Sequence, residues 1–132
     1  MGPNVLITLD LRDQTPIYEQ LVESIKELVN RGELRPGDSL PTVRQLAQDL
    51  AVNLNTVARA YRELANQGIL SVRQGRGASV VSARARYGPA EKESLRKKVR
   101  RLVNEALSLG VSSPELHAML DSELSRLTEG GK

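Results

Sequence analysis

The chain has 132 residues, a length that allows one domain or a small domain with an appendage. It contains no cysteine, which excludes disulfide bonds and thiolate chemistry and suits a reducing cellular interior. With no tryptophan, no phenylalanine and three tyrosines, its core must be aliphatic, and aromatic stacking on single-stranded bases is largely excluded. No apolar run approaches the roughly 18 residues of a membrane span, and no signal-peptide pattern is present, so we expect a soluble cytoplasmic protein without a membrane partner.

The first elements expected along the chain are a short strand and a helix. The strand candidate is VLITL at 5–9. A helix is expected from Thr15, because threonine is a favourable N-cap and Pro16 suits the first helical position. Its apolar face consists of Ile17, Leu21, Ile25 and Leu28. Gly32 ends this helix, and the turn LRPGD follows at 34–38.

Two more helices, separated by the three-residue break AVN, are expected next. The first begins at Thr42, which has the capping-box spacing to Gln45. Its buried face consists of Val43, Leu46, Ala47 and Leu50. The second covers 53–67, with Asn53 as its cap and Gly68 as its end. Two helices joined by so short a turn indicate a helix-turn-helix.

A β-hairpin is predicted directly after these helices. The runs ILSVR at 69–73 and ASVV at 78–81 are rich in β-branched residues. The glycine-rich segment QGRG at 74–77 lies between them and is typical of a hairpin turn. A helix-turn-helix followed by a hairpin is a winged helix.

The last third of the chain is predicted to form two helices after a linker at 84–89. Leucine, valine and alanine recur at spacings of 4-3-4-3 in the first of these helices, at Leu95, Val99, Leu102, Ala106 and Leu109. This spacing is a heptad seam. Gly110 breaks the helix, and Ser113 begins a final helix that carries Leu116, Met119, Leu120, Leu124 and Leu127.

The third helix has two chemically different faces. Val57, Tyr61 and Leu64 share one face, whereas Asn55, Arg59, Arg62 and Asn66 lie about 140–200° away at 100° per residue. In a helix-turn-helix the outward face enters the major groove of DNA, where asparagine pairs with adenine and arginine with guanine or phosphate. The alternative is a solvated face, in which Arg59 forms an i,i+4 pair with Glu63.

Other residues around this helix are candidates for DNA contacts. Thr56, on its flank, can reach a phosphate or a thymine methyl group, and Arg44 can grip the backbone or a base edge at the lip of the groove. At the wing tip the candidates are Arg73, Gln74, Gly75 and Arg76. A wing enters the minor groove, whose negative potential suits arginine. The alternatives are an exposed Arg44 packing on a neighbour and an ordinary hairpin turn.

Positive charge is concentrated from the middle of the chain to Arg101. Between 42 and 76 there are five arginines against two acidic residues, and between 84 and 101 there are eight basic residues against two acidic ones. This distribution is typical of a polyanion-binding protein. The run RKKVRR at 96–101 is a weaker case, because its Lys97, Arg100 and Arg101 lie opposite the heptad seam and fit a solvated face.

The sequence offers no set of catalytic or metal-binding residues. His117 is the single histidine, and without a second imidazole or a thiol it cannot share a metal ion with another soft ligand. The short Gly75–Gly77 segment precedes a strand rather than a helix, which argues against a phosphate-cradling loop. We therefore expect no catalytic residue, no metal and no enzymatic activity.

From Ile17 to Val81 the sequence resembles the GntR family of bacterial transcription regulators. The motifs that carry this resemblance are GELRPGDSLP before the second helix and VNLNTVARAYREL in the third. It covers about half of the chain, and the short helical tail is similar to that of the YtrA subgroup. The resemblance implies a dimeric repressor or other regulator, often one that controls transport operons.

The resemblance also implies specific DNA contacts. The residues that match the family's contact positions are Arg44, then Asn53, Asn55 and Thr56 at the start of the recognition helix, and Gly75 in the wing. Many relatives have arginine one position before Arg59, where this chain has Ala58, so their specificity does not transfer. Some relatives fuse this head to an aminotransferase-like domain that uses pyridoxal phosphate. This chain is too short for that domain, and we expect no cofactor.

Together these observations predict a mostly α fold with a small β-hairpin, organised as a winged helix-turn-helix DNA-binding domain at 1–83, a linker at 84–89 and a helical dimerisation region at 90–132. A lone two-helix hairpin covers only part of its apolar stripes, whereas two hairpins can close a four-helix core. The predicted dimerisation residues are Leu95, Val99, Leu102, Ala106, Leu109, Leu116, Leu120 and Leu124.

The predicted function is sequence-specific binding of double-stranded DNA by a homodimer, at an inverted-repeat operator. A winged-helix protein-interaction or architectural module with weak or no specific DNA binding is the alternative. The polar face of Asn55 and Arg59 favours the first interpretation. The sequence identifies no small-molecule effector, no operator and no regulated gene.

Overall fold

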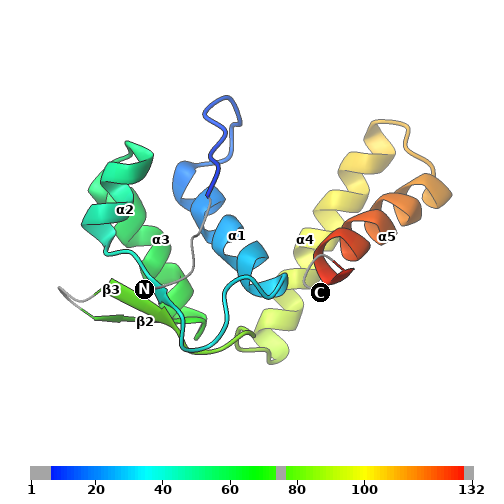
Figure 1. The fold of residues 1–132 in the computed structure, drawn as a ribbon. Coiled ribbons are helices and arrows are strands. Elements are labelled where there is room, and N and C mark those ends of the chain that lie inside the picture. Colours follow the sequence, from blue (N-terminus) through cyan, green and yellow to red (C-terminus); the bar gives the residue numbers. More distant parts are fainter. Residues whose placement is uncertain (1–6, 74–76, 130–132) are drawn as a thin grey trace. The chain divides into compact units, whose positions relative to one another are not determined.

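The computed structural model describes residues 7–73 and 77–129, and its contacts divide the chain into two compact units between Ala85 and Arg86 (Figure 1). The described part of the first unit contains helices α1 to α3 and a three-stranded sheet, and that of the second contains α4 and α5. Among the described residues no helix is both long and apolar enough to cross a membrane. This winged-helix head with a helical hairpin confirms the predicted fold class.

Helix α1 spans Ile17–Asn30 and begins differently from the prediction. Pro16, not Thr15, holds the N-cap position, and no side chain caps this end of the helix. The Thr15 carbonyl oxygen instead accepts a hydrogen bond from Gln20 Nε2 at 3.0 Å. The C-terminal end agrees with the sequence, since Gly32 adopts a positive φ of 78° just after the helix.

The strand predicted at 5–9 is wrong for the residues that the structure describes, because 7–9 form no strand. The backbone of the next residue, Asp10, pairs with a side chain instead of a neighbouring strand. Its N–H donates to Gln20 Oε1 at 2.8 Å, and its carbonyl accepts from Gln20 Nε2 at 2.9 Å. Ile7 and Leu9 are half-buried against the core. Ile7 and Leu9 therefore pack against the core, and residues 7–9 do not join the sheet.

Helices α2 (Val43–Leu50) and α3 (Leu54–Asn66) form the predicted helix-turn-helix. Thr42 Oγ1 accepts a hydrogen bond from the Gln45 N–H at 3.1 Å, and Asn53 Oδ1 accepts one from the Asn55 N–H at 2.7 Å. Both predicted caps are confirmed. Ala51 has a φ of 56°, a left-handed conformation that reverses the chain between the two helices.

The sheet contains one strand more than the predicted hairpin. Its order is β1-β3-β2, with β1 at Ser39–Leu40, β2 at Leu70–Arg73 and β3 at Gly77–Val80. All neighbouring strands are antiparallel. Strand β1 has only two residues, too few to show a period-two pattern in the sequence.

Gly77 is required where the wing meets β1. Its φ is 79°, and a Cβ atom there would lie 3.2 Å from the backbone oxygen of Leu40. An L-residue with a side chain would meet both the strained backbone and a fixed strand. The close approach of β1 thus explains the glycine at this end of the wing.

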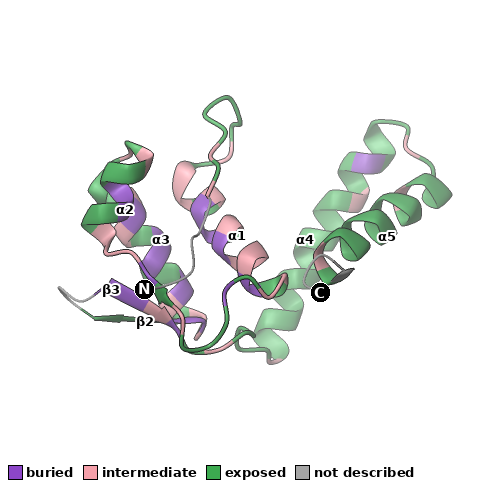
Figure 2. Cartoon of the chain, in the orientation of Figure 1, coloured by how far each residue is buried: buried purple, intermediate pink, exposed green. Residues whose placement is uncertain are grey.

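The core of the first unit is aliphatic, as the composition predicts, and has one tyrosine at its centre (Figure 2). It joins the inner faces of α1, α2, α3 and the sheet, including the fully buried Leu21, Ile25, Val57 and Leu64. Tyr61 is 1% exposed, and its hydroxyl donates to the Pro41 carbonyl at 2.7 Å. Burial raises the pKa of this phenol. The tyrosine therefore ties α3 to the segment that leads into α2.

We expect Tyr61→Phe to lower the free energy of unfolding by about 1–2 kcal/mol, because it leaves the part-buried Pro41 carbonyl without its donor. The raised pKa adds a pH effect. Above about pH 10 the phenol of unfolded Tyr61 releases its proton, whereas folded Tyr61 keeps it. The contribution of Tyr61 to the free energy of unfolding is therefore complete below about pH 10 and declines at higher pH. Denaturant unfolding of both proteins at pH 7 and above pH 10 measures this. A difference that does not shrink at high pH would contradict the expectation.

The second unit consists of α4 (Pro89–Ser108) and α5 (Ser113–Glu129). At the start of α4, the Gly88 N–H donates to Glu91 Oε1 at 2.9 Å. Gly110 has a φ of 83° and separates the helices. Ala106 is the one buried residue among the described side chains of these two helices. As Figure 2 shows, this hairpin leaves most of its surface exposed, including the apolar part.

Candidate nucleic-acid interface

The two faces of α3 lie as the sequence predicts. Val57, Tyr61 and Leu64 are at most 1% exposed and belong to the core. The side chains of Asn55, Arg59, Arg62 and Asn66 are exposed. The helix thus turns a continuous polar stripe outward from a rigid support. That these residues contact DNA stays a prediction.

The N-terminal end of α3 combines a cap with exposed donors. The Asn53 side chain is exposed, and its Oδ1 atom is engaged by the Asn55 backbone N–H. The capping bond fixes the Asn53 side chain while leaving its Nδ2 group as a donor at the surface. Thr56 is half-buried on the flank of the helix. A helix N-terminus of this kind, with its partial positive charge, favours a phosphate group.

Arg59 takes part in an interaction that sequence reasoning missed. Its Cζ atom lies 3.7 Å from the centre of the Tyr18 ring, on α1. The predicted alternative partner, Glu63, instead accepts a hydrogen bond from Gln67 Nε2 at 3.0 Å. No local spacing signals a contact between residues so far apart in the chain, so only the packing of α1 on α3 reveals it.

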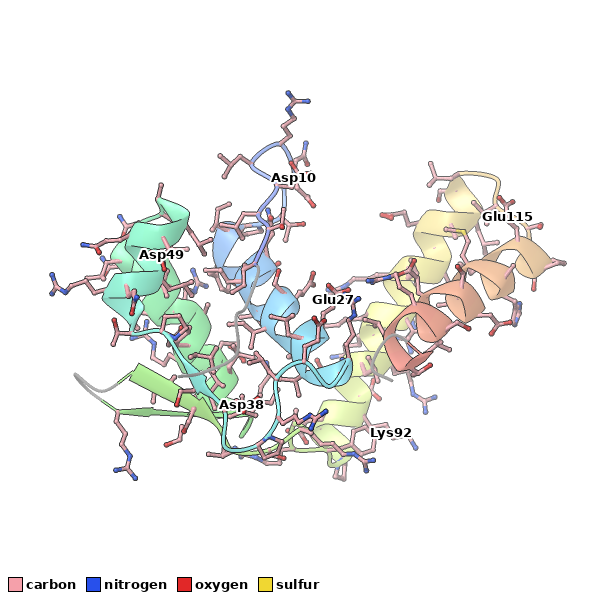
Figure 3. All side chains as sticks on the ribbon, in the orientation of Figure 1. Asp10, Glu27, Asp38, Asp49, Lys92 and Glu115 are labelled. Carbon is pink, nitrogen blue, oxygen red and sulfur yellow. The ribbon has the colours of Figure 1, made fainter. Side chains whose placement is uncertain are left out.

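The helix-turn-helix surface has an excess of positive charge. Helices α2 and α3 carry Arg44, Arg59 and Arg62, all exposed, against Asp49 and Glu63. Figure 3 shows Asp49 on α2. None of the three arginines forms an ion pair with a residue that the structure describes. Cations that form no ion pair favour binding of a polyanion, because no internal salt bridge must be broken.

The wing is only partly within the described residues. Arg73 is exposed at the end of β2. Gln74, Gly75 and Arg76, which the sequence assigns to the wing tip, lie outside the described residues. Of the two described strands beside it, β3 pairs with β1 through Ser39–Ser79 and Leu40–Ala78.

Comparison with known proteins places this architecture in a family. Residues 17–80 match the profile described as bacterial regulatory proteins, gntR family. The chain is 37% identical over 128 residues to the HTH-type transcriptional repressor YtrA of Bacillus subtilis, covering 96% of this chain and 98% of that protein. This chain belongs to the GntR family. It is a winged helix-turn-helix transcription regulator of the YtrA type.

Two solved structures extend this similarity to the fold. A protein from Listeria monocytogenes, described as a transcriptional antiterminator, has a TM-score of 0.86 and 31% identity, over 95% of this chain and 94% of that chain. The GntR-family transcription factor YtrA from Sulfolobus acidocaldarius has a TM-score of 0.58 and 38% identity, over 77% of this chain and 97% of that one.

In this GntR protein the predicted dimerisation residues fall into two groups. Those that remain exposed are Leu95, Val99, Leu102, Leu109, Leu120 and Leu124, with exposed fractions between 43% and 76%. Ala106 is buried and Leu116 is half-buried. Val103 on α4 is also half-buried, and the sequence did not single it out because it lies outside the heptad spacing.

Helix α4 also carries a basic face. Lys97, Arg100 and Arg101 are exposed and form no ion pair with any described residue. Figure 3 shows Lys92 on the same helix. At 100° per residue, Lys97, Arg100 and Arg101 lie away from the stripe of Leu95 and Leu102. Their exposure agrees with the solvated face that the sequence favours.

The described residues form no group of three or more His, Cys, Asp or Glu side chains that could hold a metal ion. His117 makes a local contact, with Nδ1 lying 2.8 Å from the Ser113 carbonyl oxygen of the preceding helical turn. An Nδ1–H donor suits that distance. The imidazole is therefore engaged with its own helix.

Proposed function

We propose that this GntR-family regulator is a cytoplasmic repressor that binds an inverted-repeat operator as a homodimer. The outward polar stripe of α3, backed by a rigid core, is the observation that carries the proposal. The name of the Bacillus subtilis relative supports repression. The relatives are transcription regulators, which supports a function without enzymatic activity.

In this proposal α3 enters the major groove. Asn55 lies in its first turn, where recognition helices contact base edges, and asparagine reads adenine through two hydrogen bonds. Arg62 and Asn66 lie on the same stripe, about two and three turns beyond Asn55. Arg44, at the start of α2, contacts the DNA backbone. The wing, with Arg73 at its described end, reaches the adjacent minor groove.

The dimer is proposed to form through α4 and α5. Their exposed leucines and valine lie at heptad or helical spacing, which is the pattern of a helix bundle with a missing partner. A second copy of the same hairpin supplies a complementary stripe. Such pairing is normally two-fold, so it presents two recognition helices to two inverted half-sites.

A non-DNA-binding interaction module is the alternative. It predicts a neutral or acidic α3 face, whereas α3 has two exposed arginines against Glu63. Selection of bound sequences from random duplex DNA separates the two functions. An enriched inverted repeat is expected. Failure to enrich any sequence, together with weak binding to all duplexes, would favour the alternative.

Asn55→Ala tests base readout directly. We expect a loss of about 1–3 kcal/mol on the selected operator and a smaller loss on random DNA, because only the operator presents the correct base edge. Asn104→Ala, the same change at an exposed position of α4, serves as the control and should alter neither affinity. Fluorescence anisotropy on both duplexes measures the difference. Equal losses on operator and random DNA would show that Asn55 does not read a base.

A further inference from the structure

Arg59 rests on an aromatic ring that belongs to another helix. Its Cζ atom is 3.7 Å from the centre of the Tyr18 ring, which is van der Waals distance for two stacked planar groups. This is a cation–π contact, in which the ring face attracts the delocalised positive charge. Arg59 itself remains exposed. The contact therefore orients the guanidinium without withdrawing it from a ligand.

The ring that supports Arg59 is itself held in place. Tyr18 lies in the first turn of α1 and is half-buried against the core. The same helix contributes Leu21 and Ile25, both 0% exposed, to the core shared with α3. The Tyr18 hydroxyl lies 3.1 Å from Glu19 Oε1 and donates to it. Packing against the core therefore holds the ring in place without need of the exposed hydroxyl bond, and Arg59 of α3 reaches this ring.

We propose that Tyr18 is a positioning residue for DNA binding: its ring holds Arg59 at the α1 edge of the recognition face, where the guanidinium contacts a backbone phosphate and not a base edge. This inference rests on the proposed function. It distinguishes Arg59 from Asn55, which lies on the same stripe with an exposed side chain and whose backbone N–H is bound by the Asn53 cap.

The geometry of a stacked guanidinium suits a phosphate. Stacking uses one flat face of the group, while its five N–H donors lie in the plane and point outward from the rim. Two of these donors can bind two phosphate oxygens in parallel. To reach a base edge instead, the side chain would have to leave the ring and lose the contact.

Positioning strengthens binding because it reduces the side-chain conformational entropy that Arg59 loses on association with DNA. A free arginine samples many rotamers and loses them when it binds, whereas a stacked one has already lost part of that freedom. An exposed cation–π contact of ordinary strength corresponds to a factor of about two to five in Kd. We therefore expect a modest effect that appears only when Arg59 is present.

The test measures Kd of the intact chain for the operator and for random duplexes at several salt concentrations. The variants compared with the wild type are Tyr18→Leu, Tyr18→Phe, Arg59→Ala and the Tyr18→Leu/Arg59→Ala double variant. Arg59→Ala should weaken binding to both duplexes by about ten-fold and reduce the salt slope by about two per dimer. Tyr18→Leu should weaken both by about three-fold. Tyr18→Phe, which keeps the ring, should match the wild type.

The double variant decides whether the two residues act together. Its affinity should equal that of Arg59→Ala, because the ring has nothing to position once the guanidinium is gone. Circular dichroism sets a temperature at which all variants are folded. If Tyr18→Leu weakens binding equally with and without Arg59, the positioning role is wrong.

Two further outcomes would overturn the proposal while leaving DNA binding intact. A loss confined to the operator duplex would make Arg59 a base reader. Equal losses for Tyr18→Phe and Tyr18→Leu would assign the effect to the hydroxyl and not the ring. A wild-type protein that binds no duplex would instead refute the proposed function, and the inference with it.

Discussion

Affinity for DNA should fall by about 10³-fold or more when the salt concentration rises from 50 to 200 mM. Arg44, Arg59, Arg62 and Arg76 of two subunits are proposed to neutralise about 6–10 phosphates between them. Each neutralised phosphate releases condensed counterions, so the logarithm of the binding constant falls with a slope of about −0.9 per contact. Anisotropy titrations on one operator duplex across this salt range measure the slope.

A variant shows whether the slope comes from the proposed surface. Arg44→Ala should reduce it by about two per dimer, because each subunit loses one phosphate contact. Arg101→Ala, on the basic face of α4, should leave the slope and the affinity nearly unchanged. Flat salt dependence of the wild type on its best duplex would reject DNA binding through these arginines.

Removal of α4 and α5 should convert the homodimer to a monomer and weaken operator binding by two or more orders of magnitude. The exposed apolar residues of both helices are the proposed dimer contact. Once two subunits are joined, the second recognition helix binds at a high effective concentration, and this advantage is lost in a monomer. Truncation after Ala85 separates the units where the contacts divide them.

The truncated head should remain folded, because its core cluster lies entirely between Leu21 and Val80. Sedimentation of the intact chain at micromolar concentration should give about twice 14.5 kDa. A single species near 14.5 kDa would contradict the dimer. So would a truncated head that still dimerises and binds its operator with unchanged affinity.

A point substitution tests the same interface without truncation. Leu102→Asp places a charge on the apolar stripe of α4 and should produce monomers, since an unpaired charge in an apolar contact is strongly unfavourable. Leu107→Asp is the matched control on the same helix. Leu107 is 60% exposed and lies about 140° around the helix from Leu102, away from the stripe. It should leave the dimer intact.

Local signals in the sequence determined most of the helical architecture. The caps at Thr42 and Asn53 and the glycines after α1 and α3 marked helix ends that the structure confirms. The inward and outward faces of α3 followed from helical periodicity alone. These features are readable because each depends on residues within one or two helical turns of one another.

The tertiary structure decided the features that depend on distant partners. Strand β1 exists because its two residues pair with β3, and residues 7–9 form no strand while Gln20 binds the adjoining backbone at Asp10. The stacking of Arg59 on Tyr18 likewise requires α1 to pack on α3. A two-residue strand and a contact between separate helices leave no periodic pattern in the sequence. The partner that stabilises each of them is brought near only by folding.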